Sequence, residues 1–141
     1  MKKTTKIFAT LILALALCAG VSVSAFAAAN ETTYVQPRWA SIGSVSHDMT
    51  FSAAGNGNAY AIAKKQSTAT SISATLTVYK KVGSSYVYID SVSGTKTIGS
   101  VGLSIDFPCT SGTTYKSVLK VTAYTGSTPE SETFEVIKTC P

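Results

Sequence analysis

The sequence predicts an all-β protein built as an antiparallel sandwich of about seven strands. From Arg38 onward, apolar and polar residues alternate with a period of two, as in strands with one buried face. Threonine, serine, valine and tyrosine are abundant, and glycine-containing turns recur at short, near-regular intervals. These features favour an immunoglobulin-like architecture over the alternative, a small barrel. One disulfide is also expected in this domain.

The first predicted strand covers residues 47–54, where Met49, Phe51 and Ala53 share one face. Asn56-Gly57 follows it, and this dipeptide is the strongest signal for a two-residue hairpin. The hairpin then returns along a partner strand at residues 59–65. Trp39, the only tryptophan, is expected to anchor the core or the edge of a hairpin.

Five further strands are predicted, at residues 70–80, 85–92, 101–107, 113–124 and 131–138. The turns between them are expected at Gly83-Ser84, Ser93-Gly94, Ser111-Gly112 and Gly126 to Pro129. A tyrosine corner is also expected, in which Tyr115 forms a hydrogen bond to an upstream backbone group.

The segment YKKVGSSYVY, residues 79–88, carries three of the seven tyrosines. A type II′ turn at Gly83-Ser84 would place Tyr79 opposite Tyr88 and Lys81 opposite Tyr86, within cation–π range. This register puts Ile72, Ala74, Leu76, Val78, Val87 and Ile89 on the core face. The other face then carries Thr75, Thr77, Tyr79, Lys81, Tyr86, Tyr88 and Asp90. A three-residue loop would instead turn Tyr86 and Tyr88 inward, but it separates apolar from polar residues less cleanly.

The first 27 residues have the pattern of a secretory signal peptide, with three lysines, an apolar stretch and Ala25-Phe26-Ala27 before the cleavage point. We therefore expect secretion without membrane insertion after cleavage, a flexible leader at residues 28–37, and one sandwich domain at 38–141. Lipidation at Cys18 is a minor alternative, because Leu17 is bulky for a lipoprotein box. Removing the signal lowers the formal charge from +5 to 5 − 3 = +2, which leaves no support for nucleic-acid binding.

Cys109 and Cys140 are the two cysteines that follow the signal peptide. Pairing the last two predicted strands brings Cys140 close to the residues before Thr113, where Cys109 lies. In an oxidising exterior these residues are expected to form a disulfide, which closes a loop of 140 − 109 = 31 residues. The chain-entropy model values such a loop at roughly 3–4 kcal/mol.

Several short features of the sequence occur together: Arg38-Trp39 with Ile42, the run 76–81, Gly83 with Tyr86, Tyr115, and Glu130-Ser131. In these features the chain resembles one group of proteins, the small exported immunoglobulin-like proteins of Gram-positive bacteria, whose function is uncharacterised. The resemblance covers most of the chain after the signal and implies fold and export, but no activity or cofactor.

No catalytic motif is visible in the sequence. His47 is the single histidine, expected to be an exposed turn residue, and there is no Gly-x-Ser-x-Gly elbow. Glu130 and Glu132 are interpreted as solvated charges at an exposed hairpin end. Neither a metal site nor a cofactor is predicted, because two distant cysteines and one histidine do not make a zinc set.

The sequence therefore predicts a monomeric, non-catalytic binding module with an unknown extracellular glycan or protein as its partner. Tyr79, Lys81, Tyr86 and Tyr88 are the predicted contact residues. A purely structural tyrosine face is the competing interpretation, since cross-strand aromatic pairs stabilise hairpins without any ligand. The functional alternatives are an inhibitor that uses residues 126–130 as an extended loop, and a passive surface protein that associates through an edge strand.

Overall fold

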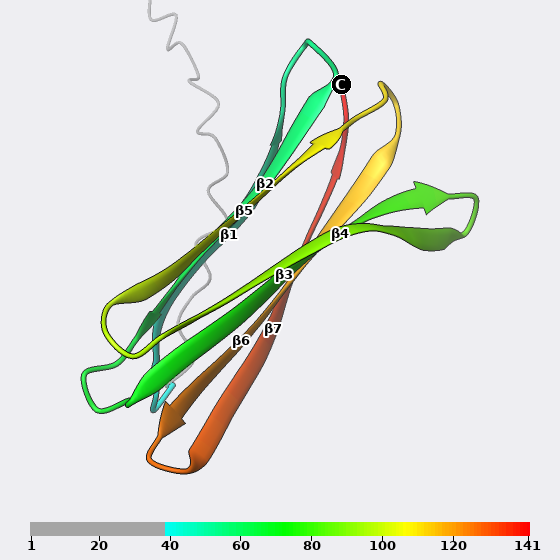
Figure 1. Cartoon of the computed structure of the whole chain (residues 1–141). Helices are drawn as coiled ribbons and strands as arrows, with labels where there is room; N and C mark the ends of the chain where they lie inside the picture. The colour runs from blue at the N-terminus through cyan, green and yellow to red at the C-terminus, as the bar shows by residue number, and fades with distance from the viewer. Residues whose placement is uncertain (1–38) are drawn as a thin grey trace, which may run out of the picture. The chain divides into compact units, whose positions relative to one another are not determined.

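The computed structural model describes residues 39–141 (Figure 1). The predicted signal peptide, Cys18 and the leader at 28–37 lie outside these residues. The described part is all-β, with seven strands: β1 (Ile42–Phe51), β2 (Asn56–Lys65), β3 (Ser71–Val82), β4 (Ser85–Lys96), β5 (Ser100–Pro108), β6 (Thr114–Thr125) and β7 (Thr128–Thr139). None of the described segments is a helix of the length and hydropathy that crossing a membrane requires.

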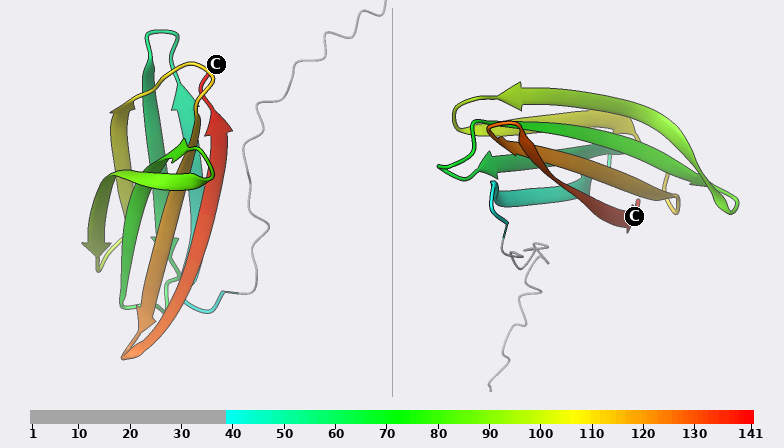
Figure 2. Two further views of the ribbon diagram at one scale, coloured as in Figure 1. Left: turned by 90° about the vertical axis from the view of Figure 1, so that its right-hand side faces the viewer. Right: turned by 90° about the horizontal axis from the view of Figure 1, so that it is seen from below.

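The strands form two antiparallel sheets. One sheet has the order β1-β2-β5 and the other the order β4-β3-β6-β7. The apolar faces of the two sheets pack against each other as two layers (Figure 2). The strand β4 and the strand β5 that follows it lie in different sheets, so the chain crosses between the layers there.

The core comes from the alternating residues of the central strands. In β3, the side chains of Ile72, Ala74, Leu76 and Val78 are buried, as the alternation predicts. Burial of a Leu or Ile side chain contributes about 1.5–3 kcal/mol, so this one face contributes much of the driving force for folding. Trp39 packs edge-on against Phe134 with ring centroids 5.7 Å apart, which confirms its expected anchoring role.

The first hairpin turn lies earlier than the sequence predicts. Phe51 pairs with Gly57, so Asn56 and Gly57 are the first residues of β2. The turn uses residues 52–55 instead, with Gly55 in the left-handed region at φ 78°. Gly57 has a packing role, because a Cβ there would lie 2.5 Å from the Phe107 ring. Gly57 is therefore explained by close packing against Phe107, and Asn56-Gly57 does not form a type I′ turn.

Two other turn predictions need correction. Ser93-Gly94 lies inside β4, and a Cβ on Gly94 would come within 3.1 Å of Val101, so this glycine also permits close packing. The β6–β7 turn contains only Gly126 and Ser127, because Thr125 pairs with Thr128. Residues 126–130 therefore do not form the extended loop that the inhibitor alternative requires.

The sequence predicts that Glu130 is a solvated edge charge, but in the structure its carboxylate binds backbone amides. Its Oε1 atom accepts a hydrogen bond from the Ala40 amide at 3.0 Å, and its Oε2 atom accepts from Ser41 at 2.7 Å and Ile42 at 2.9 Å. Desolvation raises the pKa of this carboxylate, but the three amide hydrogen bonds together outweigh it and hold the pKa below its usual value. Glu130 thus joins the start of β1 to the β6–β7 hairpin.

Candidate binding surface

The β3–β4 hairpin positions the predicted tyrosines as the two-residue register requires. Val82 pairs with Ser85, Lys81 with Tyr86, and Tyr79 with Tyr88. Gly83 has φ 60°, and no non-glycine residue in the described chain has a positive φ. A positive φ at the first central residue alone is the pattern of a type II′ turn, which confirms the prediction.

The three tyrosines gather on the outer face of the four-stranded sheet. The rings of Tyr79 and Tyr88 meet edge-on, with centroids 6.3 Å apart and an interplanar angle of 79°. Tyr88 is the most open of the three, at 58% exposure, while Tyr79 and Tyr86 are partly buried. The edge-on contact restrains two rings that would otherwise rotate freely.

The cation beside these rings is Lys116, and not Lys81 as predicted. Lys116 lies opposite Tyr79 on β6, and its Nζ atom is 4.6 Å from the Tyr86 ring centroid and 5.6 Å from that of Tyr79. The same Nζ atom is 3.5 Å from Glu135 Oε1 on β7. Lys81 faces Tyr86 in register but is exposed. We call Tyr79, Lys81, Tyr86, Tyr88 and Lys116 the tyrosine platform.

Sequence reasoning missed Lys116 because the lysine belongs to a distant strand. Alternation in residues 113–124 predicts that Lys116 and Tyr115 point to opposite faces of the sheet. It does not predict that β6 pairs with β3. Only the strand order β4-β3-β6-β7 brings this side chain beside the hairpin.

A β-bulge in β4 changes the predicted face of Asp90. Val78 pairs with Asp90, not with Ile89, so one extra residue lies in β4 between Tyr88 and Asp90. The bulge removes Asp90 from the tyrosine face, and Ser91 takes the position opposite Thr77. Ile89 is only partly buried against the core.

The prediction that Val87 belongs to the core is wrong, because its side chain is 51% exposed. The end of the β3–β4 hairpin projects beyond the three-stranded sheet (Figure 2), so no second layer covers its inner face. Val82, at the same end, is exposed for the same reason. The alternation assigned the face correctly, but the hairpin is longer than the sheet it packs on.

Hydroxyl groups continue the outer face away from the platform. Paired side chains form cross-strand hydrogen bonds, at 2.8 Å for Thr75–Ser93, 3.1 Å for Thr77–Ser91, 2.8 Å for Thr122–Ser131 and 3.0 Å for Thr114–Thr139. Each hydroxyl can donate one hydrogen bond and accept two, so pairing leaves capacity for a further partner. The face thus combines aromatic rings, a cation and ordered hydroxyls.

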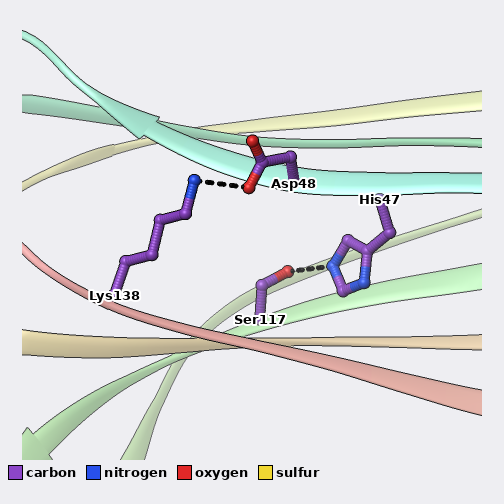
Figure 3. A network of polar contacts seen from close by, with 4 residues as sticks. All are labelled: His47, Asp48, Ser117 and Lys138. Atoms are coloured by element: carbon purple, nitrogen blue, oxygen red, sulfur yellow. Dashed lines mark hydrogen bonds and ion pairs between the residues drawn. The ribbon is translucent and has the colours of Figure 1, made fainter. Parts of the chain in front are cut away.

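His47 is buried inside the sandwich, which corrects the expectation of an exposed turn residue. It lies within β1 on the same face as Met49 and is 2% exposed. Its Nε2 atom is 2.7 Å from the Oγ atom of Ser117, which is fully buried on β6 (Figure 3). Burial lowers the pKa of His47 to about 4, although the nearby Asp48 carboxylate raises it. The imidazole is therefore neutral at pH 7.

The histidine–serine pair lacks the arrangement of a catalytic triad. The Asp48 carboxylate turns away from the imidazole and its Oδ1 atom is 2.6 Å from Lys138 Nζ (Figure 3). Nδ1 of His47 has no hydrogen-bond partner among the described residues. No carboxylate thus orients the ring, and both His47 and Ser117 are closed to solvent. The pair acts as a buried polar contact between the two sheets.

The cysteines meet as predicted at the C-terminal end of β7. The two sulfur atoms lie 2.6 Å apart, as a contact between two thiols and not as a disulfide. This hydrogen bond, together with desolvation, raises the pKa of Cys140 to about 11. Nearby, the hydroxyl of Tyr115 accepts a hydrogen bond from the Thr110 amide at 3.0 Å, which confirms the tyrosine corner.

The comparisons with known proteins assign no activity to these residues. No protein-family model matches the chain, and no curated protein matches it. Within residues 39–141, no group of three or more His, Cys, Asp or Glu side chains could hold a metal ion. The tyrosine platform is the candidate site that the ring contacts and the position of Lys116 define.

Proposed function

We propose that this protein is a secreted, non-catalytic binding module whose tyrosine platform stacks on the sugar rings of an extracellular glycan. One observation carries the proposal. Three tyrosine rings share one open sheet face, and cross-strand contacts together with Lys116 already hold them in place. Because these side chains are ordered before binding, little conformational entropy remains to be lost on contact with a ligand.

The chemistry of the face supports a glycan over an apolar partner. A sugar ring has a C–H face that packs on an aromatic ring and a rim of hydroxyls that needs hydrogen bonds. The platform offers the rings, and the rows from Thr75–Ser93 to Thr77–Ser91 offer the hydroxyls. Lys81 is exposed and adds positive charge, while the Glu135 carboxylate offsets part of the charge of Lys116. The remaining positive charge favours glycans that carry acidic groups.

The proposed class also rests on the fold and on the burial of the single histidine of the described chain against Ser117. The strand orders β1-β2-β5 and β4-β3-β6-β7 support an immunoglobulin-like topology, with β4 at the edge of the second sheet. The close approach of Cys109 to Cys140 supports a disulfide formed after export. The sealed His47–Ser117 pair supports a non-catalytic role.

The test is a titration of tyrosine and tryptophan fluorescence against neutral and acidic glycans and cell-wall fragments. We expect a saturable change that is lost in the Tyr79→Ala/Tyr88→Ala double variant. Tyr60→Ala is the matched control, because Tyr60 is 37% exposed on the three-stranded sheet and lies outside the platform. A response that survives the double variant, or no response to any glycan, would contradict the proposal.

Lys116→Met separates the cation from the rings. If acidic groups are recognised, this variant weakens binding of acidic glycans and leaves neutral glycans nearly unchanged. Equal loss for both kinds of glycan would instead show that Lys116 acts by positioning the rings of Tyr79 and Tyr86.

A further inference from the structure

The two outer edges of the four-stranded sheet differ in how well they are protected from further strand pairing. An edge strand exposes unpaired backbone groups, and charged residues or proline usually block them. The edge strand β7 has such protection, with Pro129, Glu132, Glu135 and Lys138. The other edge strand, β4, has twelve residues and only two charged ones, Asp90 and Lys96.

The second half of β4 is regular and open. Beyond the bulge, its residues pair with β3 in continuous register, from Asp90 opposite Val78 to Lys96 opposite Ile72. Among residues 39–141, no strand pairs with the other side of β4. This segment has no proline, and most of its side chains are exposed. It therefore has the properties of an edge that accepts another strand.

The two charges select one partner and one register. In an antiparallel pair of identical strands, residues face each other when their numbers have a constant sum. Asp90 faces Lys96 only when the two-fold axis passes through residue 93, because 90 + 96 = 2 × 93. Asp90 and Lys96 are separated by an even number of positions in a regular stretch of β4, so their side chains lie on the same face of the sheet.

We propose that β4 pairs with β4 of a second copy of this chain, in antiparallel register about Ser93. The resulting dimer has a continuous eight-stranded sheet and two symmetric Asp90–Lys96 ion pairs. The contact is isologous, so it closes as a dimer and leaves no free β4 edge for further growth. This inference replaces the expected monomer and does not depend on the glycan proposal, because the tyrosines lie on the far side of the bulge.

Sedimentation velocity over a concentration series tests the association with the chain of residues 28–141, which contains both described sheets. A single edge-to-edge contact buries little area, so we expect a dissociation constant of roughly 10–100 µM. Asp90→Lys and Lys96→Asp should each weaken self-association about tenfold or more, since each sets like charges opposite each other. The Asp90→Lys/Lys96→Asp double variant should restore it.

Mixing the two single variants gives a sharper test of the register. Their heterodimer has only complementary charges at the contact, so the mixture should associate where neither variant does alone. Loss of association in the single variants without recovery in the mixture would overturn the ion-pair register.

Cross-linking tests the position of the axis. Ser93→Cys places two thiols next to the axis, and a short thiol-to-thiol cross-linker should join them. Ser131→Cys is the matched control, because Ser131 is also an exposed edge serine and also pairs with a threonine hydroxyl at 2.8 Å. The proposal fails if Ser93→Cys cross-links no better than Ser131→Cys, or if the unmodified chain stays monomeric at every concentration.

Discussion

The buried histidine makes the stability of the sandwich sensitive to acid. His47 is neutral in the folded chain, with its Nε2 atom bonded to Ser117 Oγ. Its pKa is lowered from 6.5 to about 4, so the unfolded chain binds a proton at a higher pH than the folded chain does. The stabilisation is complete above pH 6.5 and is lost progressively as the pH falls toward 4.

The magnitude follows from the difference between the two pKa values. A difference of about 2.5, at about 1.4 kcal/mol for each pKa unit, is about 3–4 kcal/mol of unfolding free energy. A chain of this size has a typical net stability of about 5–15 kcal/mol, so the loss is easily measured.

Urea unfolding between pH 7 and pH 4, followed by tryptophan fluorescence, measures this dependence. His47→Gln keeps a side-chain amide near Ser117 but cannot be protonated in this range. We expect the variant to be less stable than the wild type at pH 7 and to lose much less stability on acidification. Ser117→Ala is the companion variant, since it removes the hydrogen bond but keeps the titrating ring.

One result would refute this reasoning. If His47→Gln loses stability between pH 7 and pH 5 as steeply as the wild type, then the buried ring is not the group that titrates. Glu130 does not confuse the comparison between pH 7 and pH 5, because its contribution is lost only as the pH falls below the ordinary pKa of 4.5 and toward the lowered pKa of the folded chain.

Three further predictions concern single contacts. Glu130→Gln should lower the unfolding free energy by about 1.5–3 kcal/mol at pH 7, and the difference from the wild type should shrink in urea titrations as the pH falls through the lowered pKa. Gly57→Ala should cost about 1–3 kcal/mol by urea unfolding, because its Cβ meets the Phe107 ring; an unchanged midpoint would mean that the ring moves freely. Tyr115→Phe should cost about 1–3 kcal/mol in thermal unfolding, since the Thr110 amide loses its acceptor; full stability would show that water replaces the hydroxyl.

Local patterns predicted the number and approximate places of the strands, because alternation and turn chemistry act within a few residues, but β1 begins five residues before the predicted start at 47 and β4 runs four residues beyond the predicted end at 92. Near its turn, the register of the β3–β4 hairpin follows from Gly83 together with the separation of apolar and polar residues, and this register brings Tyr79 opposite Tyr88. In the first hairpin, packing against a distant strand overrides the local turn signal. Asn56-Gly57 has the right residues for a tight turn, but the Phe107 ring on β5 uses Gly57 for packing.

The candidate site was only partly predictable. Three tyrosines and Lys81 come from one contiguous segment, so alternation could place them on one face. The bulge that moves Asp90 off this face depends on how β4 fits over the core, which no short window of sequence reports. The exposure of Val87 depends on the length of the other sheet.

Local sequence patterns were enough to establish the all-β class, the approximate strand ranges, the tyrosine face of the hairpin and the approach of Cys109 to Cys140. That Lys116 lies over the rings, that Glu130 binds three amides and that His47 is buried against Ser117 emerged only from the folded chain. The difference lies in the range of the interactions. Alternation specifies which residues share a face of one strand, whereas the order of strands in a sheet and the packing of two sheets depend on contacts between distant segments.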